Sequence, residues 1–270
     1  MTVVGVDDTD SRDGMCTTHL AARLAGRLRE RATVERLLLV RLNPAIEFKT
    51  RGNGALAVHT DADPAAAFEA ACDLVDAAAE PADDTNPGVV VAPGDPRDVP
   101  DAVADFARRA VRGRLDTETA ERAAGDAGYR TRGWGVGRGR IGALAAVGSW
   151  AAFGEWTYER IAYREPDRRG TPRAVDGESV FRAADRHYPA VWDTVDRGEG
   201  EVVCVPHTPG PVLYGLRGDS REAVAAAAAD VECDEPVARA ETFVTNQGTD
   251  AHLRDAGDLR DGRAYRVTGR

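Results

Sequence analysis

The chain has 270 residues, 43% of them hydrophobic, which is enough for two ordinary domains and excludes a wholly disordered protein. Acidic residues outnumber basic ones by 45 to 35, giving a formal net charge of −10, and Lys49 is the only lysine. This composition is typical of a high-salt cytoplasm, and a GC-rich genome produces the same bias. The net charge does not exclude a nucleic acid as partner, because a local basic groove on an acidic protein can bind a polyanion.

The cysteines and the hydropathy pattern indicate the compartment in which the protein is expected to work. Cys16, Cys72, Cys204 and Cys233 form no C-x-x-C pair, so the sequence holds no zinc signature and indicates a reducing compartment. The longest mildly apolar stretch, 141–154, is too short and too rich in glycine to cross a bilayer. With no signal peptide at the start, we expect a cytoplasmic protein without membrane contact.

Hydrophobic periodicity predicts alternating strands and helices over the first 150 residues, which favours an α/β domain. The expected strands are 2–8, 36–43, 54–60 and 89–92, and the expected helices are 15–31, 64–79 and 99–112. A glycine-rich segment, 130–148, follows, and its second half is expected to form an alanine-rich helix.

The pattern from 151 to 245 differs and predicts the order βαββαβ, which is ferredoxin-like. The expected strands are 157–164, 201–207, 211–218 and 238–245, with helices at 177–187 and 220–231, the second capped by Asp219 or Ser220. Residues 246–270 are too few and too polar to form a domain, and we expect them to begin another one. The predicted fold class is α/β (α+β), with domains at 1–150 and 151–245 and an incomplete region at 246–270.

Three carboxylates, Asp7, Asp8 and Asp10, follow the first expected strand. Burying such a cluster costs each carboxylate roughly several kcal/mol unless a cation compensates. Hard oxygen ligands at the end of a strand suit Mg²⁺, which in turn binds phosphate oxygens. The alternative is an acidic turn in which an aspartate caps the next helix.

A helix that begins near Met15 places Thr17 and Thr18 in its first turn, after a turn at Gly14. Free N–H groups and the helix dipole favour a phosphate at this place, and the two hydroxyls can meet it. The alternative is that the two threonines simply start the helix.

The segment 43–55 holds the single lysine close to an arginine and a glycine-rich turn. Lysine is a compact point charge with an adjustable pKa. Because arginine is used at every other basic position of the chain, the single lysine indicates that an ammonium group is needed here. Lys49 and Arg51, followed by Gly52, Asn53 and Gly54, predict a phosphate clamp, and a surface hairpin with a chance lysine is the alternative.

Two further features are less specific. The glycines of 133–142 could let backbone N–H groups face a nucleotide, although no P-loop motif is present, and a flexible connection or tight helix packing explains them equally well. Tryptophan and tyrosine side chains could stack on bases or belong to the core. These residues are Trp134, Trp150, Trp156, Tyr163, Tyr188, Trp192 and Tyr214.

Taken together, these segments resemble one family, the archaeal tRNA-isoleucine 2-agmatinylcytidine synthetases (TiaS). The matching stretches are GVDDTDSRDGMCTT, VRLNPAIEFKTRGNGA, GRGRIGALAAVG, TYERIAYR, PVLYGLRG and TNQGTDAHL, in family order from Gly5 to Leu253. The resemblance implies a kinase-like N-terminal domain, a ferredoxin-like domain, an OB-fold and a zinc ribbon. Because the chain stops soon after the OB-fold match and has no C-x-x-C pairs, we expect a C-terminally truncated member, with zinc only in the missing region.

The resemblance also implies a reaction. The family uses ATP, releasing AMP and pyrophosphate, to phosphorylate O2 of the wobble cytidine in the anticodon of an isoleucine tRNA, and agmatine then displaces the phosphate. By family position Thr18 is a phosphate acceptor. The expected agmatine site offers carboxylates, with Glu159 or Asp185 as guesses. A small-molecule kinase and a non-catalytic RNA-binding fragment are the alternatives, and the oligomeric state is not defined by the sequence.

The roles of the site residues follow from both lines of reasoning. The expected catalytic residues are Asp7, Asp8, Asp10, Thr18 and Lys49, the three aspartates also hold Mg²⁺, and the expected ATP-binding residues are Thr17, Arg51, Gly52, Asn53 and Gly54.

Overall fold

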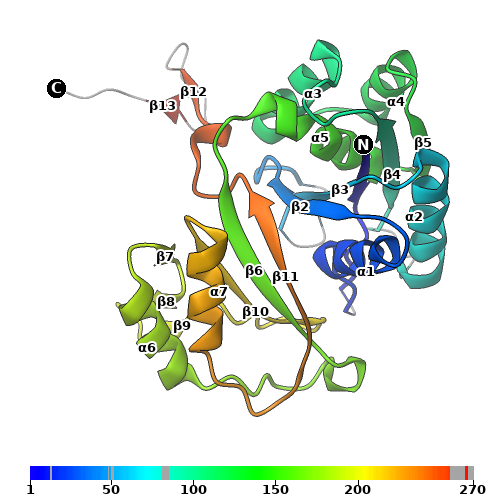
Figure 1. Cartoon of the computed structure of the whole chain (residues 1–270). Coiled ribbons are helices and arrows are strands. Elements are labelled where there is room, and N and C mark those ends of the chain that lie inside the picture. Colours follow the sequence, from blue (N-terminus) through cyan, green and yellow to red (C-terminus); the bar gives the residue numbers. More distant parts are fainter. Residues whose placement is uncertain (13, 48, 50–51, 81–84, 256–264, 267–270) are drawn as a thin grey trace.

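One nine-stranded sheet runs through both halves of the chain, in the order β5-β4-β1-β3-β2-β11-β6-β10-β7 (Figure 1). The computed structural model describes residues 1–12, 14–47, 49, 52–80, 85–255 and 265–266. The first half contains β1 (Thr2–Asp7), α1 (Thr17–Arg29), β2 (Val34–Arg41), β3 (Gly54–Thr60), α2 (Pro64–Ala78), β4 (Gly88–Pro93), α3 (Asp101–Arg112), α4 (Thr117–Asp126), β5 (Arg130–Gly133) and α5 (Gly139–Ala152).

The second half supplies the strands at the other end of the sheet. It contains β6 (Thr157–Arg164), α6 (Gly177–His187), β7 (Val191–Trp192), β8 (Val195–Asp196), β9 (Glu201–Val202), β10 (Val212–Gly218), α7 (Arg221–Ala229) and β11 (Val237–Thr245), followed by the two-residue strands β12 (Arg254–Asp255) and β13 (Tyr265–Arg266). The short 3₁₀ helices η1 (Pro166–Arg168) and η2 (Asp250–His252) complete the elements. In the part of the chain that the structure describes, no helix is long and apolar enough to cross a membrane.

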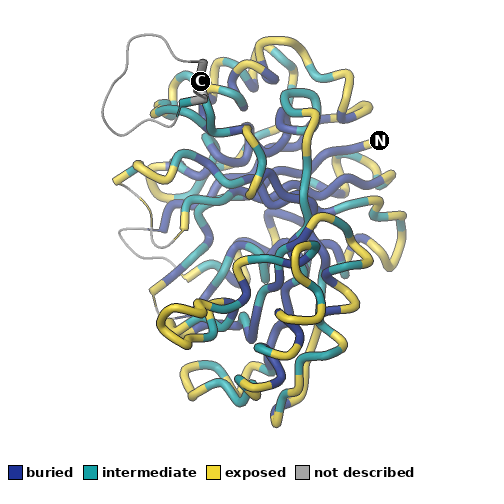
Figure 2. Tube along the Cα trace, turned by 90° about the vertical axis from the view of Figure 1, so that its left-hand side faces the viewer, coloured by how far each residue is buried: buried dark blue, intermediate teal, exposed yellow. Residues whose placement is uncertain are grey.

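Helices cover both faces of the first half of the sheet. Side chains alternate along β2, so that Leu37 and Leu39 pack with α1 and α2, whereas Leu38 and Val40 pack with α3 and α5. The central strands are therefore buried on both faces and appear as a dark core in Figure 2. Burial on both faces explains why β1 reads as a continuous apolar run rather than an alternating one.

The helix α5 lies unusually close to the strands beneath it. A Cβ at Gly5 of β1 would sit 2.1 Å from the carbonyl oxygen of Ala143, and one at Gly88 of β4 would sit 2.0 Å from the backbone nitrogen of Arg140. Glycines of the segment 130–148 approach their neighbours equally closely, since a Cβ at Gly139 would sit 2.4 Å from the backbone nitrogen of Gly88 and one at Gly148 would sit 2.4 Å from the carbonyl oxygen of Val103. The glycine-rich segment thus serves tight helix packing, one of the explanations considered above. By this packing α5 is part of the first half of the fold.

The second half has the expected ferredoxin-like strand order, with one error in our prediction. Its sheet runs β11-β6-β10-β7 with all neighbours antiparallel, and α6 and α7 pack on one face. The predicted strand 201–207 is wrong, because only Glu201–Val202 forms a strand, β9, and β9 lies outside this sheet. The second strand of the βαββαβ pattern, counted along the chain, is β7 instead. The amides of Val203 and Cys204 both donate to the carbonyl of Thr194, which bends the chain away from a ladder.

The helix α4 and the strand β5 were also not predicted. The buried residues of α4 are alanines, Ala120 and Ala124, which give little periodic signal, and β5 is a polar edge strand. The strands at 54–60 and 157–164 and the helix at 177–187 have the predicted bounds.

The two halves meet at a parallel pair of strands, β2 and β11, in which Val244 faces Leu38. Directly after β11, the fully buried side chain of Asn246 accepts a hydrogen bond from the backbone N–H of Arg41 at 2.7 Å and donates one to its carbonyl at 3.1 Å. The amide side chain of Asn246 thus satisfies the backbone N–H and C=O of Arg41 where the β2–β11 pairing ends, and it holds the two halves together.

Candidate functional site

A cavity of about 340 Å³ lies where β1, the segment 42–54, the α3–α4 connection and the start of α5 meet. This volume is within the usual range for a small-molecule site. We call it the carboxylate cavity, and most of the residues selected from the sequence line it: Asp7, Asp8, Asp10, Lys49, Gly52, Asn53 and Gly54.

Asp7 ends β1 and points toward the start of α5. A Cβ on Gly142 would sit 2.0 Å from Asp7 Oδ2, so only glycine at this helical position leaves room for the carboxylate. Burial, and then the neighbouring charge of Asp8, raise the pKa of Asp7 well above its usual value. An ionised Asp7 is therefore unfavourable here unless a cation approaches it.

Asp8 has a left-handed backbone, with φ of 56°, which is uncommon for a residue other than glycine. Its Oδ2 accepts hydrogen bonds from the backbone N–H of Asn86 at 3.2 Å and from Arg138 Nη2 at 3.1 Å. Burial raises the pKa of Asp8, and the charge of Arg138 opposes that shift. The unusual backbone directs this carboxylate away from the strand axis and onto Arg138.

Asp10 connects the carboxylate cluster to the beginning of α1. Its Oδ1 accepts from the backbone N–H of Thr17 at 2.6 Å and from Thr17 Oγ1 at 3.2 Å, while the side chain of Cys16, at the cap position, does not cap the helix. The capping role considered as the alternative for one of the three aspartates is thus present. It places a carboxylate at the positive end of the helix, where a phosphate was expected.

Described residues between 42 and 54 form the opposite wall, namely Leu42, Ile46, Lys49, Gly52, Asn53 and Gly54. Asn53 Nδ2 donates to the carbonyl of Asn43 at 2.8 Å, and the backbone N–H of Leu42 donates to the Asn53 carbonyl at 2.8 Å, so the two ends of the loop are tied together. Lys49 is exposed, and its Nζ donates to the carbonyl of Pro44. Arg51 lies outside the described residues.

Sequence reasoning missed several residues of this cavity. Arg138 and Arg114 add positive charge, and Leu42, Ile46, Leu115 and Ile141 form an apolar wall. Arg138 stands in an arginine–glycine run that we interpreted through its glycines alone. Its contact with Asp8 spans 130 residues, which no local pattern reveals.

A second cavity, of about 290 Å³, lies between the two halves of the chain, and we call it the seam cavity. It shares Asp10, Gly52 and Gly54 with the carboxylate cavity, so the two spaces adjoin. Thr17 and Thr18 line the seam cavity rather than the carboxylate cavity. Its wall from the second half includes Glu159, Asp193, Cys204, Gly215 and Arg217.

Charged and polar groups inside the seam cavity are largely paired. Glu159 is almost fully buried and lies 2.9 Å from Arg41 Nη2 and 3.7 Å from Arg217 Nε. Thr18 Oγ1 lies 3.0 Å from the sulfur of Cys16, whose pKa is raised to about 11 by burial and by Asp10, so that thiol is protonated at neutral pH. Glu159 thus lines a site, whereas the other guess, Asp185, forms an exposed ion pair with Arg197 elsewhere.

The carboxylates do not form a complete metal site by themselves. Among the described residues, no three Asp, Glu, His or Cys side chains converge closely enough to hold an ion. Mg²⁺, however, is usually held by one or two carboxylates together with water and phosphate oxygens, so the donor set around Asp7 and Asp10 fits a magnesium ion that arrives with a nucleotide.

Fold and cavities together define the class of protein: a kinase-like α+β half joined through one sheet to a ferredoxin-like half, with adjoining ligand-sized cavities at the junction. Two family models, described as the TiaS TCKD domain and the TiaS FLD domain, match residues 3–135 and 137–252.

Known proteins agree with these family models. All of this chain is 56% identical to the isoleucine-tRNA 2-agmatinylcytidine synthetase TiaS of Haloquadratum walsbyi, of which it spans 59%. The crystal structure of a complex of TiaS with its isoleucine tRNA and ATP matches 98% of the chain at 40% identity with a TM-score of 0.90, and the chain spans 64% of it. The crystal structure of the ZRD-deleted mutant of TiaS with agmatine matches 99% at 34% identity and a TM-score of 0.82, with 68% spanned. The chain belongs to the TiaS family.

Proposed function

We propose that this chain carries the ATP-binding and base-activating part of an enzyme that attaches agmatine to C2 of the wobble cytidine in an isoleucine tRNA. The proposal is carried by the assembly of the three aspartates, Lys49 and the 52–54 turn around one cavity of ligand size. The relatives whose names state this activity are longer than the chain, so the activity is proposed for it as a member of the family.

The carboxylate cavity is the proposed ATP site. Its apolar wall, Leu42, Ile46, Leu115 and Ile141, suits a flat base, and Arg138, Arg114 and Lys49 suit the phosphates. Lys49 must then exchange its bond to the Pro44 carbonyl for a phosphate oxygen, and Gly52, Asn53 and Gly54 complete that side. A phosphate-binding role for Arg51 is proposed from the sequence alone. Phosphoryl transfer asks little covalent chemistry of a protein, so positioning and charge neutralisation account for these residues.

Mg²⁺ belongs to the same proposal. Asp7, Asp8 and Asp10 offer its oxygen ligands, with Asp8 already shared with Arg138. The raised pKa values of Asp7 and Asp8 support this role, because a cation would offset the cost of burying their charges. When bound, the ion would neutralise developing charge on the phosphates.

The seam cavity is the proposed place of the cytidine and agmatine. Thr18 lines it one residue from Thr17, which is bonded to Asp10, so a phosphate accepted by the Thr18 hydroxyl would lie at the border of the two cavities. Once O2 of the cytidine is phosphorylated, the amine of agmatine can attack C2, and the C2–O2 bond breaks with phosphate as the leaving group. Glu159 and Asp193 are the carboxylates that the second half contributes to this cavity, and we assign them to the cationic amine.

The domain division is part of the same proposal. We place an ATP-binding domain at 1–150, a ferredoxin-like domain at 151–245 and the start of a further region at 246–270.

The proposal is tested by incubating the chain with ATP, Mg²⁺, an isoleucine tRNA and agmatine, and by analysing tRNA, nucleotide and protein by mass spectrometry. We expect AMP as the nucleotide product, a phosphate on Thr18 that comes from ATP, and no reaction in an Asp8→Asn variant, which keeps a residue that tolerates φ above zero. Phosphorylation of a small molecule without RNA would instead favour a small-molecule kinase. Absence of any ATP turnover with the tRNA present would refute the catalytic proposal for this chain.

A further inference from the structure

One side of α1 carries positive charge in a protein whose net charge is −10. His19, Arg23 and Arg27 follow each other at intervals of four residues, so they lie on the same side of the helix. At 1.5 Å per residue the stretch from His19 to Arg27 extends over about 12 Å. It starts at the residue directly after Thr18, which lines the seam cavity.

Two arginines of the second half complete this surface. Arg239 of β11 donates from Nη1 to the carbonyl of Ala22 at 2.6 Å and lies against Gly26, where a Cβ would sit 2.7 Å from Nη1. Arg169 brings its Nη2 to 3.3 Å from His19 Nε2. We call Arg23, Arg27, Arg169 and Arg239, with His19, the cationic patch.

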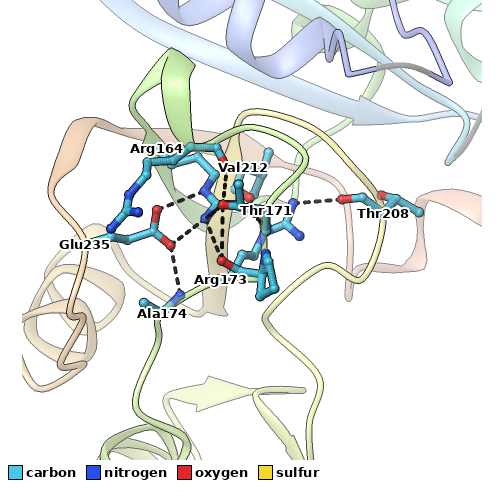
Figure 3. Close-up of polar contacts among 9 residues, drawn as sticks. Arg164, Thr171, Arg173, Ala174, Thr208, Val212 and Glu235 are labelled. Atoms are coloured by element: carbon cyan, nitrogen blue, oxygen red, sulfur yellow. Dashed lines mark hydrogen bonds and ion pairs between the residues drawn. The ribbon is translucent and has the colours of Figure 1, made fainter.

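The loop that carries Arg169 is held in place by the buried side chain of Arg164. That side chain donates to the carbonyls of Thr171 and Pro172 and to the carboxylate of Glu235 (Figure 3). The fixed loop prevents Arg169 from moving away from the other cations, so the patch is part of the folded structure.

Among the described residues, the cationic patch lacks the carboxylate partners that many other arginines have. The neighbouring Arg29, for example, pairs with Glu241 at 2.5 Å. Among the described residues, no carboxylate forms an ion pair with Arg23, Arg27, Arg169 or Arg239. Two buried nitrogen atoms, His19 Nδ1 and Arg169 Nε, have no hydrogen-bond partner in the described part.

Mutual repulsion is visible in the ionisation of the patch. Burial, followed by the charges of Arg169, Arg23 and Arg239, lowers the pKa of His19 to about 3. Burial, followed by Arg27, Arg169 and Arg239, also lowers the pKa of Arg23. No carboxylate contributes to either shift, so a bound anion would relieve a repulsion that the protein leaves uncompensated.

We propose that the cationic patch binds the phosphate backbone of the RNA substrate where the strand approaches the seam cavity. The inference rests on the proposed function, which brings an RNA base into that cavity. The charges are spread along a helix and across two segments instead of converging on one point, which suits a strand of successive phosphates better than a single free phosphate. Arginine forks bind phosphate oxygens through paired N–H groups.

The test compares two double variants of the chain with equal charge change. Arg23→Gln/Arg27→Gln removes two cations of the patch that make no hydrogen bond or ion pair in the described structure. Arg182→Gln/Arg186→Gln removes two exposed arginines at the same spacing on α6. Binding of an isoleucine tRNA is measured by fluorescence anisotropy over a series of salt concentrations, and ATP binding is measured on the same preparations.

We expect the patch variant to raise the Kd for tRNA about tenfold and to reduce the slope of log Kd against log salt by about 1.4, from two lost phosphate contacts to a single strand. The loss should be the same for a tRNA of another sequence, and ATP binding should not change. The α6 variant should match the parent chain.

Each of the following results would overturn the proposal: equal tRNA affinity and salt slope in the patch variant and the parent, an equal effect in the α6 variant, or no tRNA binding by a parent chain that binds ATP. The proposal would also be overturned if the patch variant lost affinity for inorganic phosphate but kept the tRNA affinity of the parent. The proposed ATP site is judged separately by the ATP measurement, so its failure is distinguishable from failure of the patch.

Discussion

Removing the charge of Glu235 should destabilise the ferredoxin-like half strongly, because it leaves Arg164 as a buried, unpaired cation. Both side chains are almost fully buried, and they form two parallel hydrogen bonds of 2.8 and 3.0 Å (Figure 3). Glu235 Oε1 also accepts from the backbone N–H of Ala174 at 2.9 Å. The change Glu235→Gln preserves the shape of the side chain but removes its negative charge.

The expected loss follows from the environment of the pair. Breaking a buried ion pair from one side costs about 3–5 kcal/mol, whereas replacing both partners by apolar groups is often close to neutral. Here the carbonyls of Thr171 and Pro172 also depend on Arg164, and each would lose about 1 kcal/mol or more without it. We therefore expect Glu235→Gln to cost about 3 kcal/mol and the double change Arg164→Met/Glu235→Leu to cost less than the sum of its single changes, by about 2 kcal/mol or more.

Urea unfolding at constant salt, followed by circular dichroism, measures these differences for the parent, Glu235→Gln, the single changes Arg164→Met and Glu235→Leu, and the double change. Asp185→Asn is the control, since its exposed pair with Arg197 should contribute no measurable stability. Additive single changes, or a Glu235→Gln loss no larger than that of the control, would refute the reasoning. Because the pair holds the loop of Arg169, the same variants should also weaken tRNA binding.

Three further predictions concern the first half and the cap of α7. Gly142→Ala should abolish ATP binding while the chain stays folded, because the new methyl group occupies the position of Asp7 Oδ2; calorimetric titration with ATP tests this, and unchanged affinity would contradict it. His59 is fully buried, and among the described residues neither of its ring nitrogens has a hydrogen-bond partner. Burial lowers the pKa of His59 to about 3 from 6.5, so its contribution to stability is complete above pH 6.5 and falls by about 1.4 kcal/mol per pH unit as the pH drops toward 3. His59→Leu should therefore raise the melting temperature and flatten this acid dependence by one proton, and an unaltered pH slope would argue against the assignment. Ser220→Ala should cost about 1 kcal/mol in urea unfolding, because the Ser220 hydroxyl accepts the Ala223 N–H at 3.1 Å, and a change below the experimental error would count against the cap.

The sequence predicts those elements of the fold that depend on neighbouring residues, and it does not predict those that depend on contacts between separate segments. The apolar run of β1, the pattern of β3 and the cap of α7 are local, and each was predicted close to its observed bounds. The strand predicted at 201–207 failed because the carbonyl of Thr194, which lies before the segment, accepts hydrogen bonds from two of its amides, a tertiary contact that the alternation of side chains does not reveal. The joining of both halves into one sheet depends on Asn246 and Arg41, which no periodicity connects.

The candidate site shows the same division. The aspartates and the 52–54 turn were predicted to act together, and the structure brings them to one cavity, although their roles stay predictions. Arg138 was missed because its partner, Asp8, is 130 residues away in the sequence, although the two side chains are in contact. The cationic patch was missed for a similar reason: the spacing of Arg23 and Arg27 is visible in the sequence, but the approach of Arg169 and Arg239 requires the fold.

The most direct test of the account is calorimetric titration of the chain with a non-hydrolysable ATP analogue, with Mg²⁺ and with EDTA. Two matched variants accompany the parent: Asp10→Asn, whose amide oxygen can still accept from Thr17, and Asp63→Asn, which makes the same charge change at the exposed cap of α2. The account predicts Mg²⁺-dependent binding by the parent and by Asp63→Asn, and a loss of at least tenfold in affinity in Asp10→Asn. Equal binding by all three proteins, or binding that EDTA does not weaken, would contradict the assignment of the carboxylate cavity as the site of ATP and magnesium.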